Sequence, residues 1–150
     1  MKKTVTFFYI ICMLLFQSVY ADSDKRVYET KKINPHPPRI DGYESDEIWS
    51  KLPAQGDFRQ HQPQPGDKAT EQTSFKITYD NNNVYVLINA YEQEPEKIRA
   101  RLSRRDNTDN SDMVGVLIDS YHDQQTAYEF SVNAAGVQAG LSVDLPKYIR

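Results

Sequence analysis

Apolar and polar side chains alternate in several short segments of the chain, and this pattern predicts β-strands. In residues 73–79, Phe75 and Ile77 alternate with polar residues, which is typical of a strand with one solvated face. Residues 84–91 are apolar on both faces and are predicted to form the central strand of a covered sheet. Residues 80–83 are one aspartate and three asparagines, which favour a turn, so the two strands should form a hairpin.

Two further strands are predicted in the second half of the chain. Residues 113–120 are rich in valine, leucine and isoleucine, and residues 127–133 place Tyr128 and Phe130 on one face. Residues 121–125 are polar and are expected to form the turn between these strands.

Little helix is expected. A short helix should begin at Ser45 or Asp46, with Trp49 facing inward, and residues 95–102 are compatible with one more helical turn. Short strands separated by turns favour an all-β fold. The fold class predicted is an antiparallel β-sandwich, jelly-roll-like, with one or two short helical turns.

Residues 1–21 have the pattern of a cleavable secretory signal peptide. Lys2 and Lys3 precede an apolar run that is too short to span a bilayer, and small residues stand at Val19 and Ala21. We therefore predict cleavage after Ala21 and an exported protein that is periplasmic, outer-membrane-associated or secreted. The rest of the chain contains no apolar run long enough to span a membrane.

The charge and cysteine content narrow the function classes. The only cysteine, Cys12, lies in the predicted signal peptide, so the mature chain would depend on core burial or bound ions rather than disulfides. The formal net charge is −3, and loss of Lys2 and Lys3 makes the mature chain more acidic. An acidic surface repels phosphate backbones, which argues against a nucleic-acid partner. Residues 22–32 are charged and without periodicity, and are predicted to be a leader or linker.

Five motifs in order resemble the family 9 carbohydrate-binding modules. They are Pro38-Arg39-Ile40-Asp41-Gly42 with Asp46-Glu47-Ile48-Trp49, Gln60-His61-Gln62-Pro63 before Thr73, Tyr79-Asp80 with Val84-Tyr85-Val86, Arg104-Arg105-Asp106 before a strand ending at Asp119, and Tyr128-Glu129-Phe130-Ser131-Val132-Asn133 with Gly136. The most similar branch is bacterial and places the sandwich before an outer-membrane-barrel-like region.

The resemblance covers residues 33–139 and implies a β-sandwich that binds polysaccharide or oligosaccharide. It also implies an association with hydrolases that act on O-glycosyl bonds, such as xylanases, and an outer-membrane barrel in the parent protein. Asp41, Gly42, Trp49 and Asp119 would be structural.

Two departures from the family pattern stand out. Residues 140–150 form a tail that does not match, with Gly140 where the branch carries aspartate, so we expect a domain truncated at its C-terminus. The sugar-binding members clamp a sugar between two tryptophans, whereas Trp49 is the only tryptophan here and lies in the opening motif.

Carbohydrate recognition needs aromatic faces for sugar C–H groups and planar polar groups for the hydroxyls. We predict that Tyr91 and Tyr121 supply the faces and that Arg104, Arg105 and Asn107 supply polar contacts. The alternative is that the tyrosines cover the ends of the sheets and the arginines pair with nearby acids.

Calcium is a candidate structural ion. Asp106, Asp109 and Asp112 lie close together in one loop, and Ca²⁺ binds through carboxylate, amide and carbonyl oxygens. The spacing is not that of an EF-hand, so a solvated polar loop is the alternative.

No catalytic residue is assigned. Asp119 and Glu129 are the one carboxylate pair considered for glycoside hydrolysis, and the chain lacks serine or cysteine nucleophile motifs and metal-ligand spacing of histidines. The function predicted is therefore a carbohydrate-binding module of an exported bacterial protein associated with breakdown of polysaccharide such as xylan. The alternative is a periplasmic structural or docking domain of an outer-membrane protein, without sugar affinity.

Overall fold

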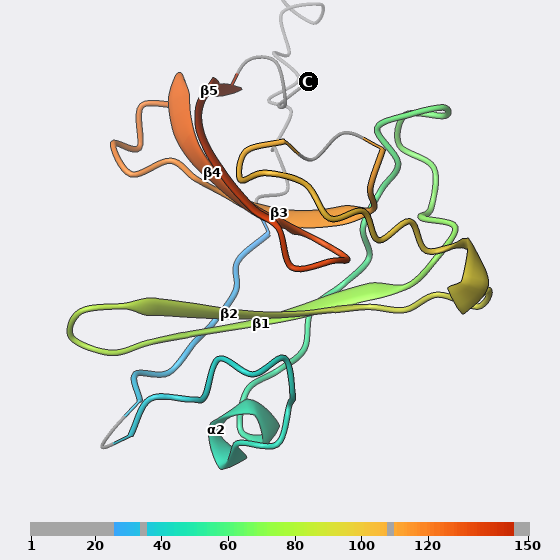
Figure 1. The fold of residues 1–150 in the computed structure, drawn as a ribbon. Helices are drawn as coiled ribbons and strands as arrows, with labels where there is room; N and C mark the ends of the chain where they lie inside the picture. The colour runs from blue at the N-terminus through green and yellow to red at the C-terminus, as the bar shows by residue number, and fades with distance from the viewer. Residues whose placement is uncertain (1–25, 34–35, 108–109, 146–150) are drawn as a thin grey trace, which may run out of the picture.

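The computed structural model describes residues 26–33, 36–107 and 110–145. The predicted signal peptide, its cleavage site and Asp109 lie outside these residues. The elements are α2 (Glu47–Ser50), β1 (Thr73–Tyr79), β2 (Val84–Ala90), the 3₁₀ turn η1 (Pro95–Lys97), β3 (Met113–Ile118), β4 (Thr126–Asn133) and β5 (Gln138–Asp144). The strands form an antiparallel pair, β1–β2, and an antiparallel sheet in the order β3-β4-β5. The two sheets lie one over the other (Figure 1), so the all-β prediction is confirmed.

The β1–β2 hairpin forms as predicted, and its turn is held by one carboxylate. Asp80 accepts hydrogen bonds from the backbone N–H groups of Asn82 and Asn83, both at 2.7 Å, and from the Tyr85 hydroxyl at 2.7 Å. These bonds stabilise the ionised form, the Asn82 N–H most of all, and lower the pKa of Asp80 to about 2.

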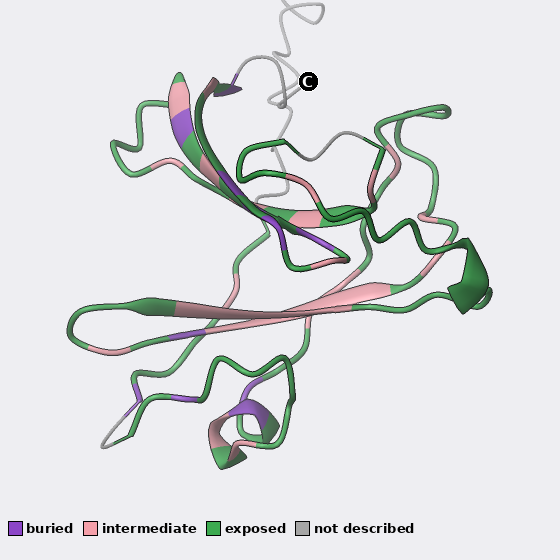
Figure 2. Ribbon diagram, in the orientation of Figure 1, coloured by how far each residue is buried: buried purple, intermediate pink, exposed green. Residues whose placement is uncertain are grey.

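The prediction that the second strand is a central one is wrong. Among the described residues β2 pairs only with β1, so it is an edge strand. Its residues are apolar on both faces because the hairpin lies between the three-stranded sheet and the layer that contains α2 (Figure 1). Figure 2 shows the half-buried residues that result along both strands.

Helix α2 packs against the outer face of the hairpin. Trp49 is only 3% exposed, and Leu52, three residues later, is also buried. The Lys76 ammonium donates to the Trp49 carbonyl oxygen at 2.8 Å and forms an ion pair with Glu44. Asn89 donates to the other oxygen of Glu44 at 3.0 Å. These contacts fix the helix to β1 and the residue Glu44, which precedes the helix, to both strands of the hairpin.

The turn before α2 depends on Asp41 and Gly42. The Asp41 carboxylate accepts from the Tyr43 N–H at 3.0 Å, and Gly42 has a φ of +81°, which favours glycine. Asp46 stands at the helix N-terminus, but its carboxylate accepts from the Arg39 N–H at 3.0 Å rather than from the helix.

The three-stranded sheet turns one apolar face toward the hairpin. Val116 lies opposite Phe130 in the register of β3 and β4, and β5 pairs with β4 on the other side. Strand β5 crosses the predicted domain boundary at residues 139 and 140. Several large apolar residues of this sheet remain partly exposed, including Phe130 at 57%. None of the described helices is long and apolar enough to cross a membrane.

Candidate functional site

The residues predicted to contact sugar lie at separate places in the fold. Tyr91 follows β2 and is 57% exposed, whereas Tyr121 lies in the turn between β3 and β4 and is 72% exposed. Tyr91 borders a hollow together with Asp112 and Met113, at the start of β3, and Tyr121 lies beyond the end of that strand. The two tyrosines therefore cannot face the same sugar ring.

Arg104, Arg105 and Asn107 belong to a turn that is attached to the edge of β5. The Asn107 N–H donates to the Arg104 carbonyl at 3.1 Å. At the centre of the turn, Asp106 donates its N–H to the Gln138 carbonyl at 3.1 Å, and its carboxylate accepts from the Gly140 N–H at 3.0 Å. The turn thus lies along β5, away from Tyr91.

Two of the predicted calcium ligands make contacts within the protein. The Asp106 carboxylate accepts from a β5 amide, as above, and the Asp112 carboxylate accepts from the Arg99 N–H at 3.0 Å. Within residues 26–33, 36–107 and 110–145 there is no group of three or more His, Cys, Asp or Glu side chains that could hold a metal ion. Asp109 lies outside those residues, so calcium binding stays a prediction.

The two carboxylates considered for hydrolysis lie just beyond the end of β3 and within β4. Asp119 accepts from the backbone N–H groups of Asp123, at 3.3 Å, and Gln124, at 2.9 Å, and so shapes the β3–β4 turn. Glu129 lies within β4, opposite Leu117 in the register.

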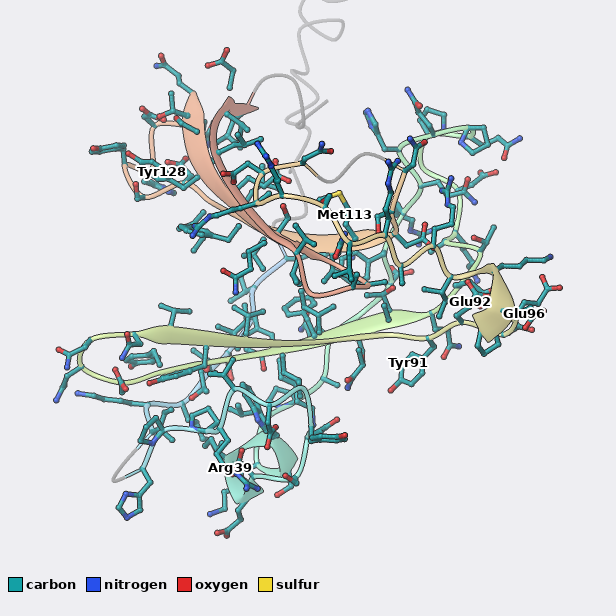
Figure 3. The ribbon with its side chains drawn as sticks, in the orientation of Figure 1. Arg39, Tyr91, Glu92, Glu96, Met113 and Tyr128 are labelled. Carbon is teal, nitrogen blue, oxygen red and sulfur yellow. The ribbon has the colours of Figure 1, made fainter. Side chains whose placement is uncertain are left out.

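Tyr91 lies beside a hollow of about 410 Å³ that we call the Tyr91 hollow. Its lining consists of the chain before β1, the start of β1 and Tyr91: Gly56, Asp57, Phe58, Lys68, Ala69, Glu71, Gln72, Thr73, Ser74 and Tyr91. Figure 3 shows the Tyr91 and Met113 side chains on opposite sides of the β1–β2 hairpin, and Tyr91 also borders the second hollow, which Met113 lines.

Backbone pairing assembles this hollow from distant segments. Gln55 and Phe75 exchange two backbone hydrogen bonds, of 3.0 and 2.7 Å, which bring the residues after Gln55 alongside β1. A Cβ at Gly56 would lie 2.8 Å from the Thr73 carbonyl oxygen, so glycine is required for this close approach. The Tyr91 N–H donates to the Gln72 carbonyl at 2.9 Å, which places Tyr91 next to the same segment.

Contacts outside the hollow hold several of its side chains. The Phe58 ring packs edge-on against Phe75, with ring centroids 6.0 Å apart, and Phe58 is still 43% exposed. Glu71 accepts from the Gln93 side-chain amide at 3.2 Å. Asp57 forms ion pairs with Arg26 at 3.1 Å and with Arg59 at 3.2 Å. The hollow therefore combines two exposed aromatic rings with oriented hydrogen-bonding groups.

The sequence pointed to Tyr91 but not to its neighbours in the hollow. Lys68, Glu71 and Gln72 fall in a polar segment whose composition indicates only a surface loop. Phe58 is the one residue whose type could have indicated the hollow, because a large apolar residue beside a polar loop suggests a packed or functional position.

Comparison with known families supports a carbohydrate-binding role for this architecture. A family model described as "Carbohydrate family 9 binding domain-like" matches residues 40–141, which is more than half of the chain. No curated protein and no solved structure matches the chain. The matched range includes α2, the Tyr91 hollow and strands β1 to β4.

Proposed function

Since the chain belongs to the carbohydrate family 9 binding domain-like family, we propose that it binds a sugar in the Tyr91 hollow. One observation carries the proposal: two exposed aromatic rings, Tyr91 and Phe58, border a hollow of about 410 Å³ beside oriented polar groups. Ligand pockets in proteins typically measure about 300–1,000 Å³, so one sugar residue fits.

The binding is non-covalent and divides between the two kinds of group. The apolar C–H face of a sugar ring packs on Tyr91 or Phe58, which have flat surfaces with little conformational freedom to lose. The hydroxyl groups donate to the Glu71 carboxylate, accept from the Lys68 ammonium and exchange hydrogen bonds with the Gln72 side-chain amide. No bond of the sugar is broken in this arrangement.

We further propose that the protein is exported and serves the breakdown of a polysaccharide such as xylan by a glycosyl hydrolase. The pattern of residues 1–21 supports export, and the family resemblance supports the association with hydrolases. The module would hold the polysaccharide while a partner enzyme cuts it.

A second candidate is a docking domain of an outer-membrane protein without sugar affinity. Its support is the position of Trp49, the only tryptophan in the sequence, which is 3% exposed and so cannot clamp a sugar.

Titration calorimetry with xylo- and cello-oligosaccharides tests the proposal. Tyr91→Ala should weaken binding about tenfold, since an exposed aromatic anchor contributes roughly 1–2 kcal/mol and 1.4 kcal/mol is a factor of ten. Tyr121→Ala is the matched control, because Tyr121 is also an exposed tyrosine, at 72% against 57% for Tyr91, but lies beyond the far end of β3. Equal losses in both variants would place the sugar elsewhere, and absence of binding to every oligosaccharide would favour the docking domain.

A further inference from the structure

A second hollow, of about 340 Å³, adjoins the Tyr91 hollow at the open end of the β1–β2 hairpin, and we call it the Met113 hollow. The two hollows share Glu71, Thr73 and Tyr91 in their linings. Thr73 and Ala90 form the outermost register pair at this end, so the hairpin stops at the shared wall. Tyr91 and Met113 lie on opposite sides of the hairpin (Figure 3). A ligand in the Tyr91 hollow can therefore reach the Met113 hollow around the end of the sheet.

Backbone hydrogen bonds build the wall of the Met113 hollow that faces away from the hairpin. The Asp112 N–H donates to the Arg99 carbonyl at 2.9 Å, and the Arg99 N–H donates to the Asp112 carboxylate at 3.0 Å. The Ala134 N–H donates to the Asp112 carbonyl at 2.8 Å. These bonds hold the segment before Arg99 beside the start of β3, so that Ile98 and Met113 line the same hollow.

The lining of the Met113 hollow is mainly apolar, and its larger side chains remain exposed. Ile98, Met113 and Val132 are 41%, 43% and 38% exposed. The remaining apolar residues of the lining are Ala90, Val114 and Ala134. Apolar side chains that gather in an exposed hollow usually mark an interaction site.

The polar groups of the Met113 hollow are largely engaged within the protein. Both oxygens of the Asp112 carboxylate accept from Arg99, at 3.0 and 3.4 Å. The Asn133 side-chain amide donates to the Arg101 carbonyl at 2.8 Å and accepts from two backbone N–H groups, at 3.0 and 2.8 Å. One oxygen of Glu92 accepts from a backbone N–H at 2.9 Å. Sugar hydroxyls buried here would find few partners, so the hollow suits an apolar group.

The contrast between the two hollows indicates the kind of ligand that fills both. The Tyr91 hollow is lined mostly by polar residues, among them Lys68, Gln72 and Ser74, whereas the Met113 hollow is mainly apolar. A sugar that carries an apolar substituent has the same two-part character. Its ring and hydroxyl groups match the first hollow, and its substituent matches the second.

We propose that the sugar bound in the Tyr91 hollow carries a short apolar chain, attached through one of its oxygen atoms, and that this chain lies in the Met113 hollow. The proposal rests on the proposed function, because it extends the same sugar site. The chain passes the end of the hairpin at Tyr91 and packs against Ile98, Met113 and Val132. An O-acyl ester on a polysaccharide and an alkyl aglycone both supply such a chain. The binding is non-covalent and leaves the ligand unchanged.

Titration calorimetry with methyl, ethyl, propyl and butyl β-D-xylopyranosides tests the proposal. Each buried methylene contributes about 0.8 kcal/mol, which is nearly fourfold in affinity when 1.4 kcal/mol is a factor of ten. The butyl glycoside should therefore bind about fifty times more tightly than the methyl glycoside. Xylobiose esterified with butanoic or with acetic acid is the second arm. A gain in either arm supports the proposal, and the arm that shows it tells whether the chain is an ester or an aglycone.

Three variants locate the chain, with the ratio of butyl to methyl affinity as the readout. Ile98→Ser removes part of the apolar wall and should lower the ratio severalfold. Ala134→Leu, at an exposed position, fills the hollow and should lower the ratio without loss of a packed side chain. Leu102→Ser is the matched control and should keep the ratio, because Leu102 is 80% exposed and lines neither hollow.

The outcomes distinguish this proposal from the sugar site on which it rests. Equal binding of the methyl and butyl compounds in both arms would overturn the proposal and leave the sugar site standing. A ratio that stays at the wild-type value in both Ile98→Ser and Ala134→Leu would also overturn it, because the chain would then lie elsewhere. If no glycoside and no xylo- or cello-oligosaccharide binds, the sugar site and the present proposal both fail.

Discussion

Replacement of Trp49 by alanine tests how α2 is held to the hairpin. The Trp49 side chain is 3% exposed and lies beside the buried Leu52, so its removal leaves a cavity that the short helix cannot fill. Truncation of a buried tryptophan costs about 3–5 kcal/mol, against a total stability of roughly 5–15 kcal/mol for a domain. The bond from the Lys76 ammonium to the Trp49 carbonyl survives the change, because the acceptor is a backbone atom of residue 49. The expected result is a folded but much weaker domain.

Urea unfolding followed by far-ultraviolet circular dichroism measures the effect, since the variant has lost the only tryptophan fluorophore. Tyr43→Ala is the matched control: it removes a 71% exposed ring a few residues before the helix and should change stability by about 0.5 kcal/mol or less. A Trp49→Ala midpoint equal to that of the wild type would refute the packing argument. Unchanged stability with lost sugar affinity would instead assign Trp49 to the binding site.

Three further predictions concern pH, calcium and processing. Because the pKa of Asp80 is lowered to about 2, its contribution to stability should be complete above the unfolded pKa of about 3.9 and disappear as the pH falls toward 2. Thermal melts between pH 2 and 6 should show this loss in the wild type and less of it in Asp80→Asn; identical profiles would contradict it. If the acidic loop binds calcium, the melting temperature should rise with added calcium and Asp109→Ala should abolish the rise, whereas a curve insensitive to calcium and to chelator would leave the loop solvated. Mass spectrometry of the exported protein should find a mature N-terminus at Asp22, and intact Met1 on an exported product would contradict the predicted cleavage.

The sequence by itself determined the strands of the first hairpin and of the β3–β4 pair. Side-chain alternation is a local property, so the pattern around Phe75 and Ile77 was enough to identify β1 as a strand. The expectation that one face of this strand is solvated is wrong: Thr78 is fully buried and Tyr79 is 40% exposed, because the layer that contains α2 covers the face expected to be solvated. Strand β5 was missed although Ala139 and Val143 alternate with less apolar residues, because Gly140 weakens the local preference. Its pairing with β4 makes this segment a strand.

Lateral pairing was beyond the reach of the sequence pattern. The apolar residues of β2 correctly predicted that both faces of the strand are covered. Burial of the two faces does not indicate whether another strand pairs with each edge of β2. The edge position of β3 in the sheet order β3-β4-β5 could not be predicted for the same reason: backbone N–H and C=O groups are common to all strands, and only the pairing decides which of them face outward.

The candidate site likewise contains residues that the sequence could indicate and residues that only the tertiary structure brings together. Tyr91 was recognisable because an aromatic residue follows an apolar strand, whereas Phe58 and Gln72 became its neighbours only through the backbone bonds of Gln55 to Phe75 and of Tyr91 to Gln72. Tyr121 has the same local character as Tyr91, yet β3 separates the two. The sequence could therefore identify candidate residues by their chemical type, but which of these residues meet depended on long-range pairing. Contacts between segments far apart in the chain leave no periodic pattern in the sequence of either segment.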